Sequence, residues 1–156
     1  MEIFVHKNDL PYVEDDTNLN NDFDRNFLRN EIIPSLGKRW SKLPERAALT
    51  SLTAKKKKLS LDFMLEKNFK KEISTGIIER AKFIETPSFL IEELIRLILR
   101  KKGIALPSKK VLSEIMNVFF HKKPSNESYV EWSRKDGEQI GGKVFSEHND
   151  IILKKK

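Results

Sequence analysis

The stretch TPSFLIEELIRLILRKKG, residues 86–103, decides the fold. Thr86 followed by Pro87 is typical of a helix start, because a threonine hydroxyl can cap the first turn and proline needs no N–H there. Seven leucines and isoleucines follow between residues 90 and 99 and leave almost no polar face before Arg100. Gly103 is a residue type that ends helices. We therefore predict a helix over residues 87–102, buried in the core.

The chain after this helix predicts a second helix and then a small sheet. Ser108 can cap a helix whose apolar residues recur at helical spacing as far as Phe119. After Pro124 the apolar period changes to two, which is typical of strands. The predicted strands and turns are, in order, Tyr129–Trp132, a turn at Asp136–Gly137, Lys143–Phe145, a turn near Asn149–Asp150, and Ile151–Leu153.

The chain before residue 86 predicts two more helices. A long one runs from Pro44 toward Lys71, with an apolar stripe of Leu49, Leu52, Leu59 and Phe63. A shorter one begins near Asp24 and is bent or ended by Pro34. The predicted fold class is therefore mainly α (α+β), a helical domain closed by a small antiparallel sheet.

Composition limits the function classes. The chain has 156 residues, 38% of them hydrophobic, which is enough for one core with a small satellite. It has no cysteine, and its three histidines lack metal-ligand spacing, so we expect no metal site. No apolar run is long enough for a membrane span and no secretion signal is present, so we expect a cytoplasmic protein.

The charge is unevenly distributed. Residues 1–40 hold eight acidic and five basic residues, whereas the whole chain carries +7, so residues 41–156 carry +10. Such an excess is expected of a protein that binds a polyanion, although a solvated lysine-rich surface would look the same. The candidate contacts with such a polyanion are the lysine clusters at Lys55, Lys56, Lys57, Lys58, Lys101, Lys102, Lys109 and Lys110.

The stretch EDDTNLNNDFDRNFLRNEIIPSL, residues 14–36, carries the candidate chemistry. Arg25 and Arg29 lie four apart on the predicted helix and could hold phosphates or carboxylates as a rigid fork. Asn26 between them can bond backbone or a base. The alternative is structural, with Asp15 and Asp16 pairing with the two arginines as a clasp between loop and helix.

The pattern of this stretch closely resembles the end of the catalytic domain in the tRNA(Ile)-lysidine synthetase family. The matching motifs are D-x-T-N at 15–18, R-N-x-x-R at 25–29 and I-I-P-x-L at 32–36, with Trp40 following. A G-x-x-L-P-S turn at 103–108 and the final small sheet resemble that family's substrate-binding domain. The resemblance places residues 1–40 at the end of an α/β ATP-pyrophosphatase-type domain and residues 41–156 in a helical tRNA-binding domain. It thereby implies that the eight lysines of the basic clusters contact tRNA.

The resemblance implies a carbon–nitrogen ligase. Family members use ATP, with magnesium, to adenylylate the C2 oxygen of the first anticodon cytidine of an isoleucine tRNA, and the lysine amine then displaces AMP. Arg25, Asn26 and Arg29 would then lie at the catalytic face, where an arginine suits a developing charge. Asp15, Thr17 and Asn18 would hold the loop in place.

The sequence departs from the family in one respect. The six glycines do not form the S-G-G-x-D-S loop that cradles the ATP pyrophosphate in such enzymes. We therefore expect a middle fragment that forms no lysidine alone. Two alternatives stay open: a stand-alone RNA-binding module, and a helix-turn-helix DNA binder formed by helices 87–102 and 108–120, whose second helix has a poor recognition face.

Overall fold

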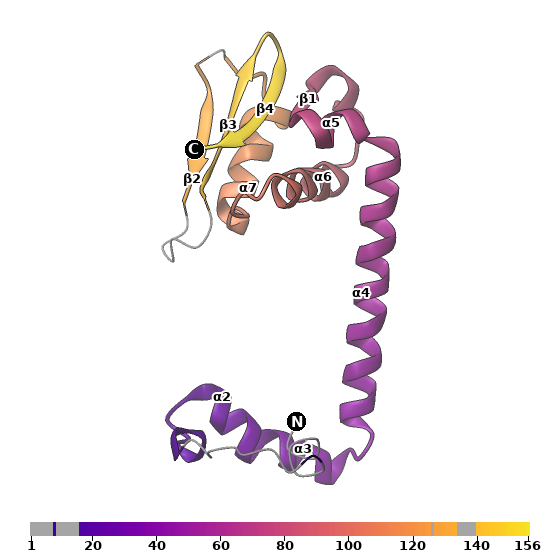
Figure 1. Ribbon diagram of the computed structural model, residues 1–156, viewed down its shortest axis with the longest axis vertical. Coiled ribbons are helices and arrows are strands. Elements are labelled where there is room, and N and C mark those ends of the chain that lie inside the picture. Colours follow the sequence, from indigo (N-terminus) through magenta and orange to yellow (C-terminus); the bar gives the residue numbers. More distant parts are fainter. Residues whose placement is uncertain (1–7, 9–15, 126, 134–139) are drawn as a thin grey trace. The chain divides into compact units, whose positions relative to one another are not determined.

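The computed structural model describes Asn8 and residues 16–125, 127–133 and 140–156 (Figure 1). The chain forms two compact units, Met1–Lys56 and Lys57–Lys156. This division falls inside helix α4 (Leu43–Asn68), whereas the sequence predicted a boundary after Trp40. The assignment of residues 1–40 and 41–156 to two functional domains stays a prediction.

The first unit is helical over the residues described. A 3-10 turn, η1 (Asp16–Leu19), precedes α2 (Asp24–Phe27), the π-helical segment η2 (Leu28–Ile32) and α3 (Ile33–Arg39). The predicted helix from Asp24 is present, but Pro34 does not end it. Pro34 lies in the first turn of α3, where a missing N–H is tolerated, and the irregular hydrogen bonding lies just before it, in η2.

Helix α4 is present as predicted, but its apolar stripe is not buried. Leu49, Leu52, Leu59 and Phe63 are all more than half exposed, and Leu65 is the one buried residue of the helix. The helix ends at Asn68, and α5 (Lys70–Thr75) follows after one residue, so the predicted continuation to Lys71 is interrupted.

The second unit packs two helices against a four-stranded antiparallel sheet (Figure 1). Strand β1 (Ile77–Glu79) and the turn η3 (Arg80–Phe83) lead to α6 (Ser88–Lys101), α7 (Lys109–Met116) and the π-helical segment η4 (Asn117–His121). Strands β2 (Tyr129–Trp132), β3 (Gly142–Glu147) and β4 (Asp150–Lys155) follow. The strand order is β1-β4-β3-β2.

The three strands predicted after Pro124 are all present. The turn between β3 and β4 uses His148 and Asn149 at positive φ, as two-residue hairpin turns require. The predicted turn at Asp136–Gly137 lies outside the described residues. Strand β1 was not predicted, because three residues are too few to show an alternating pattern.

Helix α6 lies at the centre of the core, which confirms the prediction made from residues 86–103. Six of its residues are at most 2% exposed: Ile91, Leu94, Ile95, Leu97, Ile98 and Leu99. The helix begins at Ser88, one residue later than predicted, with Pro87 as the N-cap. Ser108 caps α7 as predicted, since its hydroxyl accepts a hydrogen bond from the Val111 N–H at 3.3 Å.

The sheet closes this core from the other side. Val130, Val144 and Leu153, one from each of β2, β3 and β4, lie in one row and are buried. The indole N–H of Trp132 donates to the Ala105 carbonyl at 2.6 Å, which ties β2 to the segment between α6 and α7. The mainly helical fold with a small antiparallel sheet is therefore confirmed. The assignment of residues 1–40 to the end of an α/β ATP-pyrophosphatase-type domain stays a prediction.

Candidate functional site

Asn26 fastens the segment before α2 to the helix. Its side chain is 1% exposed, and its amide nitrogen donates to the Thr17 carbonyl at 2.7 Å and to the Asn20 carbonyl at 2.8 Å. Both acceptors are backbone groups of the 3-10 turn and the residues just after it. The contacts of Asn26 therefore hold the loop in place, and its predicted role at the catalytic face stays a prediction.

The other asparagines of this stretch do the same at the surface. The Asn30 amide nitrogen donates to the Asn18 carbonyl at 3.2 Å and to Asn21 Oδ1 at 2.9 Å. Asn20 Oδ1 accepts from the backbone N–H of Asp22 at 2.9 Å, the bond of an Asx turn. The asparagine-rich run is thus used to fix a loop that has no glycine or proline to shape it.

Two of the predicted loop-positioning residues supply backbone acceptors to the helical run. Thr17 and Asn18 supply carbonyl oxygens to Asn26 and Asn30, respectively. Asp15 lies outside the described residues, and the side chain of Asp16 is likewise not described. The clasp of Asp15 and Asp16 on the arginines therefore stays a prediction.

Arg25 and Arg29 are both exposed on the helical run that Asn26 fixes. Neither guanidinium forms a hydrogen bond or ion pair with any residue that the structure describes. The turn between them is wider than an α-helical one, because η2 begins at Leu28. Segments of this kind are frequent at functional sites. The two arginines are available to an anion.

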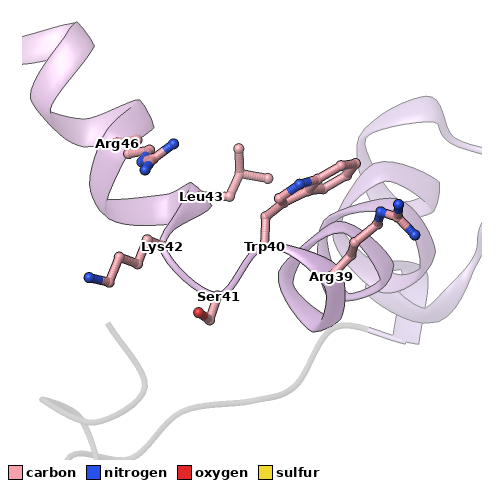
Figure 2. Close-up of a pocket in the computed structure, with 6 residues that line it drawn as sticks. All are labelled: Arg39, Trp40, Ser41, Lys42, Leu43 and Arg46. Carbon is pink, nitrogen blue, oxygen red and sulfur yellow. The ribbon is translucent and has the colours of Figure 1, made fainter.

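A hollow of about 570 Å³ lies where α3 meets α4 within the first unit. Trp40 is 54% exposed there, and the Arg39 guanidinium lies 5.3 Å from its ring centroid. Figure 2 shows the indole and the Leu43 side chain projecting into the same space, with Arg46 on the next turn of α4. Sequence reasoning noted Trp40 only within the family pattern. Its three basic neighbours, Arg39, Lys42 and Arg46, were the available clue.

The eight lysines assigned to tRNA contact divide into two groups. Lys55, Lys56, Lys57, Lys109 and Lys110 are exposed and have no polar partner among the described residues. Three others are engaged within the second unit. Lys58 pairs with Asp62 and Glu93, Lys101 pairs with Glu66 at 2.7 Å, and Lys102 donates to the Ser74 carbonyl.

Two observations concern other kinds of site. The described part of the chain holds no group of three or more His, Asp or Glu side chains arranged for a metal ion. None of the helices described there combines the length and apolar character needed to cross a membrane. The helix-turn-helix stays an alternative: the eight-residue α7 buries Leu112, Ile115 and Met116. It leaves Lys109, Lys110, Ser113 and Glu114 as its exposed polar side chains.

Comparisons with known proteins agree on one family. Residues 1–36 match the family described as PP-loop domain. The tRNA(Ile)-lysidine synthase of Buchnera aphidicola is 34% identical over 111 residues, covering 70% of this chain and 25% of the relative. That of Coxiella burnetii is 30% identical over 158 residues, covering 96% of this chain and 34% of the relative. That of Haemophilus influenzae strain 86-028NP is 26% identical over 156 residues, covering 97% of this chain and 34% of the relative. The chain thus spans about a quarter to a third of the length of these relatives.

Proposed function

Because the chain belongs to the tRNA(Ile)-lysidine synthase family, we propose that it acts in the ATP-dependent joining of lysine to the first anticodon cytidine of an isoleucine tRNA. Residues 1–36, which match the PP-loop domain, supply an edge of the catalytic part. The remainder contacts tRNA. The reactants are ATP with magnesium, lysine and tRNA, and a tRNA partner places the protein in the cytoplasm.

One observation carries the proposal for the catalytic edge. Within the residues that match the PP-loop domain, two exposed arginines lie on a helix whose attachment is fixed by the buried Asn26 amide. A fixed guanidinium can stabilise negative charge that develops in the transition state without having to reorganise. Arg25 and Arg29 are the proposed charge-stabilising residues. Asn26 is the proposed positioning residue.

The test replaces the matching arginine in a full-length relative. We expect Arg25→Ala to lower lysidine formation about a hundredfold or more, the range seen when a donor to a developing charge is removed. The melting temperature should stay within a few degrees, because an exposed arginine contributes little to stability. Lys38→Ala is the matched control, since Lys38 is an exposed cation on the same helical run, and it should change neither quantity.

The clasp alternative predicts the reverse outcome. If Asp15 and Asp16 need the arginines as ion-pair partners, Arg25→Ala leaves carboxylates unpaired and lowers the melting temperature strongly. A variant that is as active as the wild type but melts far lower would refute the catalytic assignment.

The lysines support tRNA as the partner of the second part of the chain. Counterion release makes such binding steeply dependent on salt, so we expect the affinity of this chain for a tRNA transcript to fall sharply between about 50 and 200 mM salt. Replacing Lys55, Lys56 and Lys57 with glutamate should weaken binding further. A stand-alone RNA-binding module would bind in the same way. It is distinguished by a full-length relative in which this chain replaces the matching segment, which would then form no lysidine.

A further inference from the structure

The outer face of the sheet in the second unit is ordered in rows. Side chains along a strand alternate between the two faces, and the inner face packs against α6 and α7 (Figure 1). The strand register places Tyr129, Phe145, Ile152 and Ile77 in one row across all four strands of the outer face. We call this the aromatic row, after its two ring-bearing members.

Rows of opposite charge lie on either side of the aromatic row. Lys143 of β3 is opposite Lys154 of β4, with Glu131 of β2 completing that row. On the other side, Glu147 is opposite Asp150, and Asp150 is opposite Glu79. Glu131 is paired with Lys156 at 3.1 Å, so the lysine side of the face remains basic. Glu79 is paired with Lys71 and Lys82, so the acidic side owes its negative charge to Glu147 and Asp150. The charge of the face therefore changes sign along its strands.

The two lysines lie over the faces of the rings, so a base that stacks on either ring must displace the flexible lysine side chain toward its phosphate. Lys143 Nζ is 4.3 Å from the Tyr129 ring centroid, and Lys154 Nζ is 4.6 Å from that of Phe145. Tyr129 is 58% exposed, and a hollow of about 200 Å³ lies over this part of the sheet. It is lined by Glu127, Ser128, Tyr129, Lys143, Phe145 and Lys154.

An exposed tyrosine ring and a half-buried phenylalanine ring, each with a cation, suit a ligand that carries flat rings and negative charges on one strand. Unpaired nucleotides have this chemistry, since each base can stack on a side-chain ring while its phosphate meets a cation. Paired bases do not, because their faces are covered by their neighbours in the duplex. The acidic row repels phosphate, so the backbone must run along the lysine side.

We propose that the aromatic row binds unpaired nucleotides of RNA, with bases over Tyr129 and Phe145 and phosphates against Lys143 and Lys154. This inference rests on the proposed function in taking an RNA as the partner. It goes beyond that function in naming the face, the unpaired state of the nucleotides and the side on which their backbone runs.

The test measures binding of the whole chain to a labelled ten-nucleotide oligouridylate, with a blunt RNA duplex and a tRNA transcript as further probes. We expect Tyr129→Ala to weaken oligouridylate binding about tenfold and duplex binding hardly at all. Tyr129→Phe keeps the ring and should retain most of the affinity. Phe89→Ala is the matched control, because Phe89 is an aromatic residue of the same unit that is 66% exposed and belongs to α6, not to the sheet. It should bind as the wild type does.

The lysine side has its own readout. Lys154→Gln should reduce the slope of log affinity against log salt by about one, because it removes one phosphate contact. Glu147→Gln, on the acidic side, should leave that slope unchanged. Trp132 lies on the buried side of β2, so its fluorescence reports on folding in every variant once Trp40, the other tryptophan of the chain, is replaced by phenylalanine.

Several results would overturn the proposal. One is a folded Tyr129→Ala variant that binds oligouridylate as tightly as the wild type, or that loses affinity for oligouridylate and duplex equally. Another is a wild type that does not bind oligouridylate. A third is self-association of the chain that Tyr129→Ala abolishes. The tRNA transcript separates the two levels of inference. If the wild type binds the transcript and Tyr129→Ala does not alter oligouridylate binding, this proposal alone fails. If the wild type binds oligouridylate but not the transcript, the aromatic row stands and the tRNA partner falls.

Discussion

Asn26 shows how far a single residue can be interpreted from spacing. Its place between two arginines predicted an amide that bonds backbone or a base, and the family resemblance implied a position at the catalytic face, which stays a prediction. The structure shows a buried amide with two backbone acceptors. Sequence spacing gives the position of a residue along the helix, but the direction of its amide depends on where the preceding loop passes. The asparagine-rich composition of that loop was the available indication.

Replacing Asn26 tests this positioning role. Asn26→Ala removes the amide donor from the carbonyls of Thr17 and Asn20, of which the Thr17 carbonyl keeps the Asn20 N–H at 3.2 Å. The substitution should destabilise the attachment of the loop by about 1–3 kcal/mol. Hydrogen exchange of residues 17–27 should accelerate accordingly. Asn30→Ala is the matched control, since its bonds are exposed to water and should matter less. If Asn30→Ala loosened the loop more than Asn26→Ala, the assignment of the fastening to Asn26 would be wrong.

Glu79 gives a prediction on pH. The hydrogen bond from Lys71 at 2.6 Å, together with Lys82, lowers the pKa of Glu79 to about 2. A carboxyl whose pKa is depressed by folding stabilises the native state above its unfolded pKa of about 4.3, and this contribution is lost as the pH falls toward 2.

Melting temperatures at pH 7 and pH 3 test this linkage. Glu79→Gln should lower the melting temperature at pH 7 and make it less sensitive to acid than that of the wild type. Glu85→Gln, at an exposed position with no polar partner among the described residues, serves as the control. Equal acid sensitivity of the wild type and Glu79→Gln would argue against the linkage.

At the scale of elements, the sequence predicted best where burial decides the structure. Helix α6 follows from an almost wholly apolar run that must be buried, and the hairpin of β3 and β4 follows from an apolar period of two that is typical of strands. Strand β1 could not be predicted, because its pairing with β4 depends on residues more than 70 positions away. The π-helical segment η2 could not be predicted either, since no local residue pattern separates it from an α-helix.

In helix α4 the apolar spacing predicted the helix but not which of its residues are buried. Two matched substitutions test the exposure of its side chains. Leu65 is 3% exposed and belongs to the core, so Leu65→Ala should reduce the free energy of unfolding by about 2–5 kcal/mol. Leu59 is 60% exposed, so Leu59→Ala should change it by no more than about 0.5 kcal/mol. Urea unfolding measures both values. A large loss for Leu59→Ala would mean that the stripe of α4 is covered in the folded protein.

At the scale of the whole molecule, composition and packing divide the chain differently. Near residues 37–43 the sequence changes from an acidic segment with arginines to a lysine-rich segment, and this change reflects surface charge. The division after Lys56 reflects where side chains pack, and the buried hydrophobic cluster extends from Leu65 to Leu153. Charge patterns therefore predicted that two parts exist, whereas the position of the packing boundary depends on contacts that no local pattern encodes.

This distribution of buried side chains predicts unequal local stability. Among the side chains described in residues 1–56, Asn26 is the one that is buried, whereas α6 alone contributes six buried apolar residues. Regions with few buried apolar contacts open at a lower free energy than the core. Amides of α6 should therefore exchange with solvent only through global unfolding of the second unit, and those of residues 24–39 should exchange orders of magnitude faster.

Hydrogen exchange of the intact chain, followed by mass spectrometry, measures both regions in one experiment. Leu65→Ala provides the internal comparison, because it weakens the core of the second unit. It should accelerate exchange in α6 and leave residues 24–39 unchanged. Equal protection of the two regions in the wild type, or a matching acceleration in both, would show that the two units unfold as one, and the packing boundary inside α4 would then have no energetic counterpart.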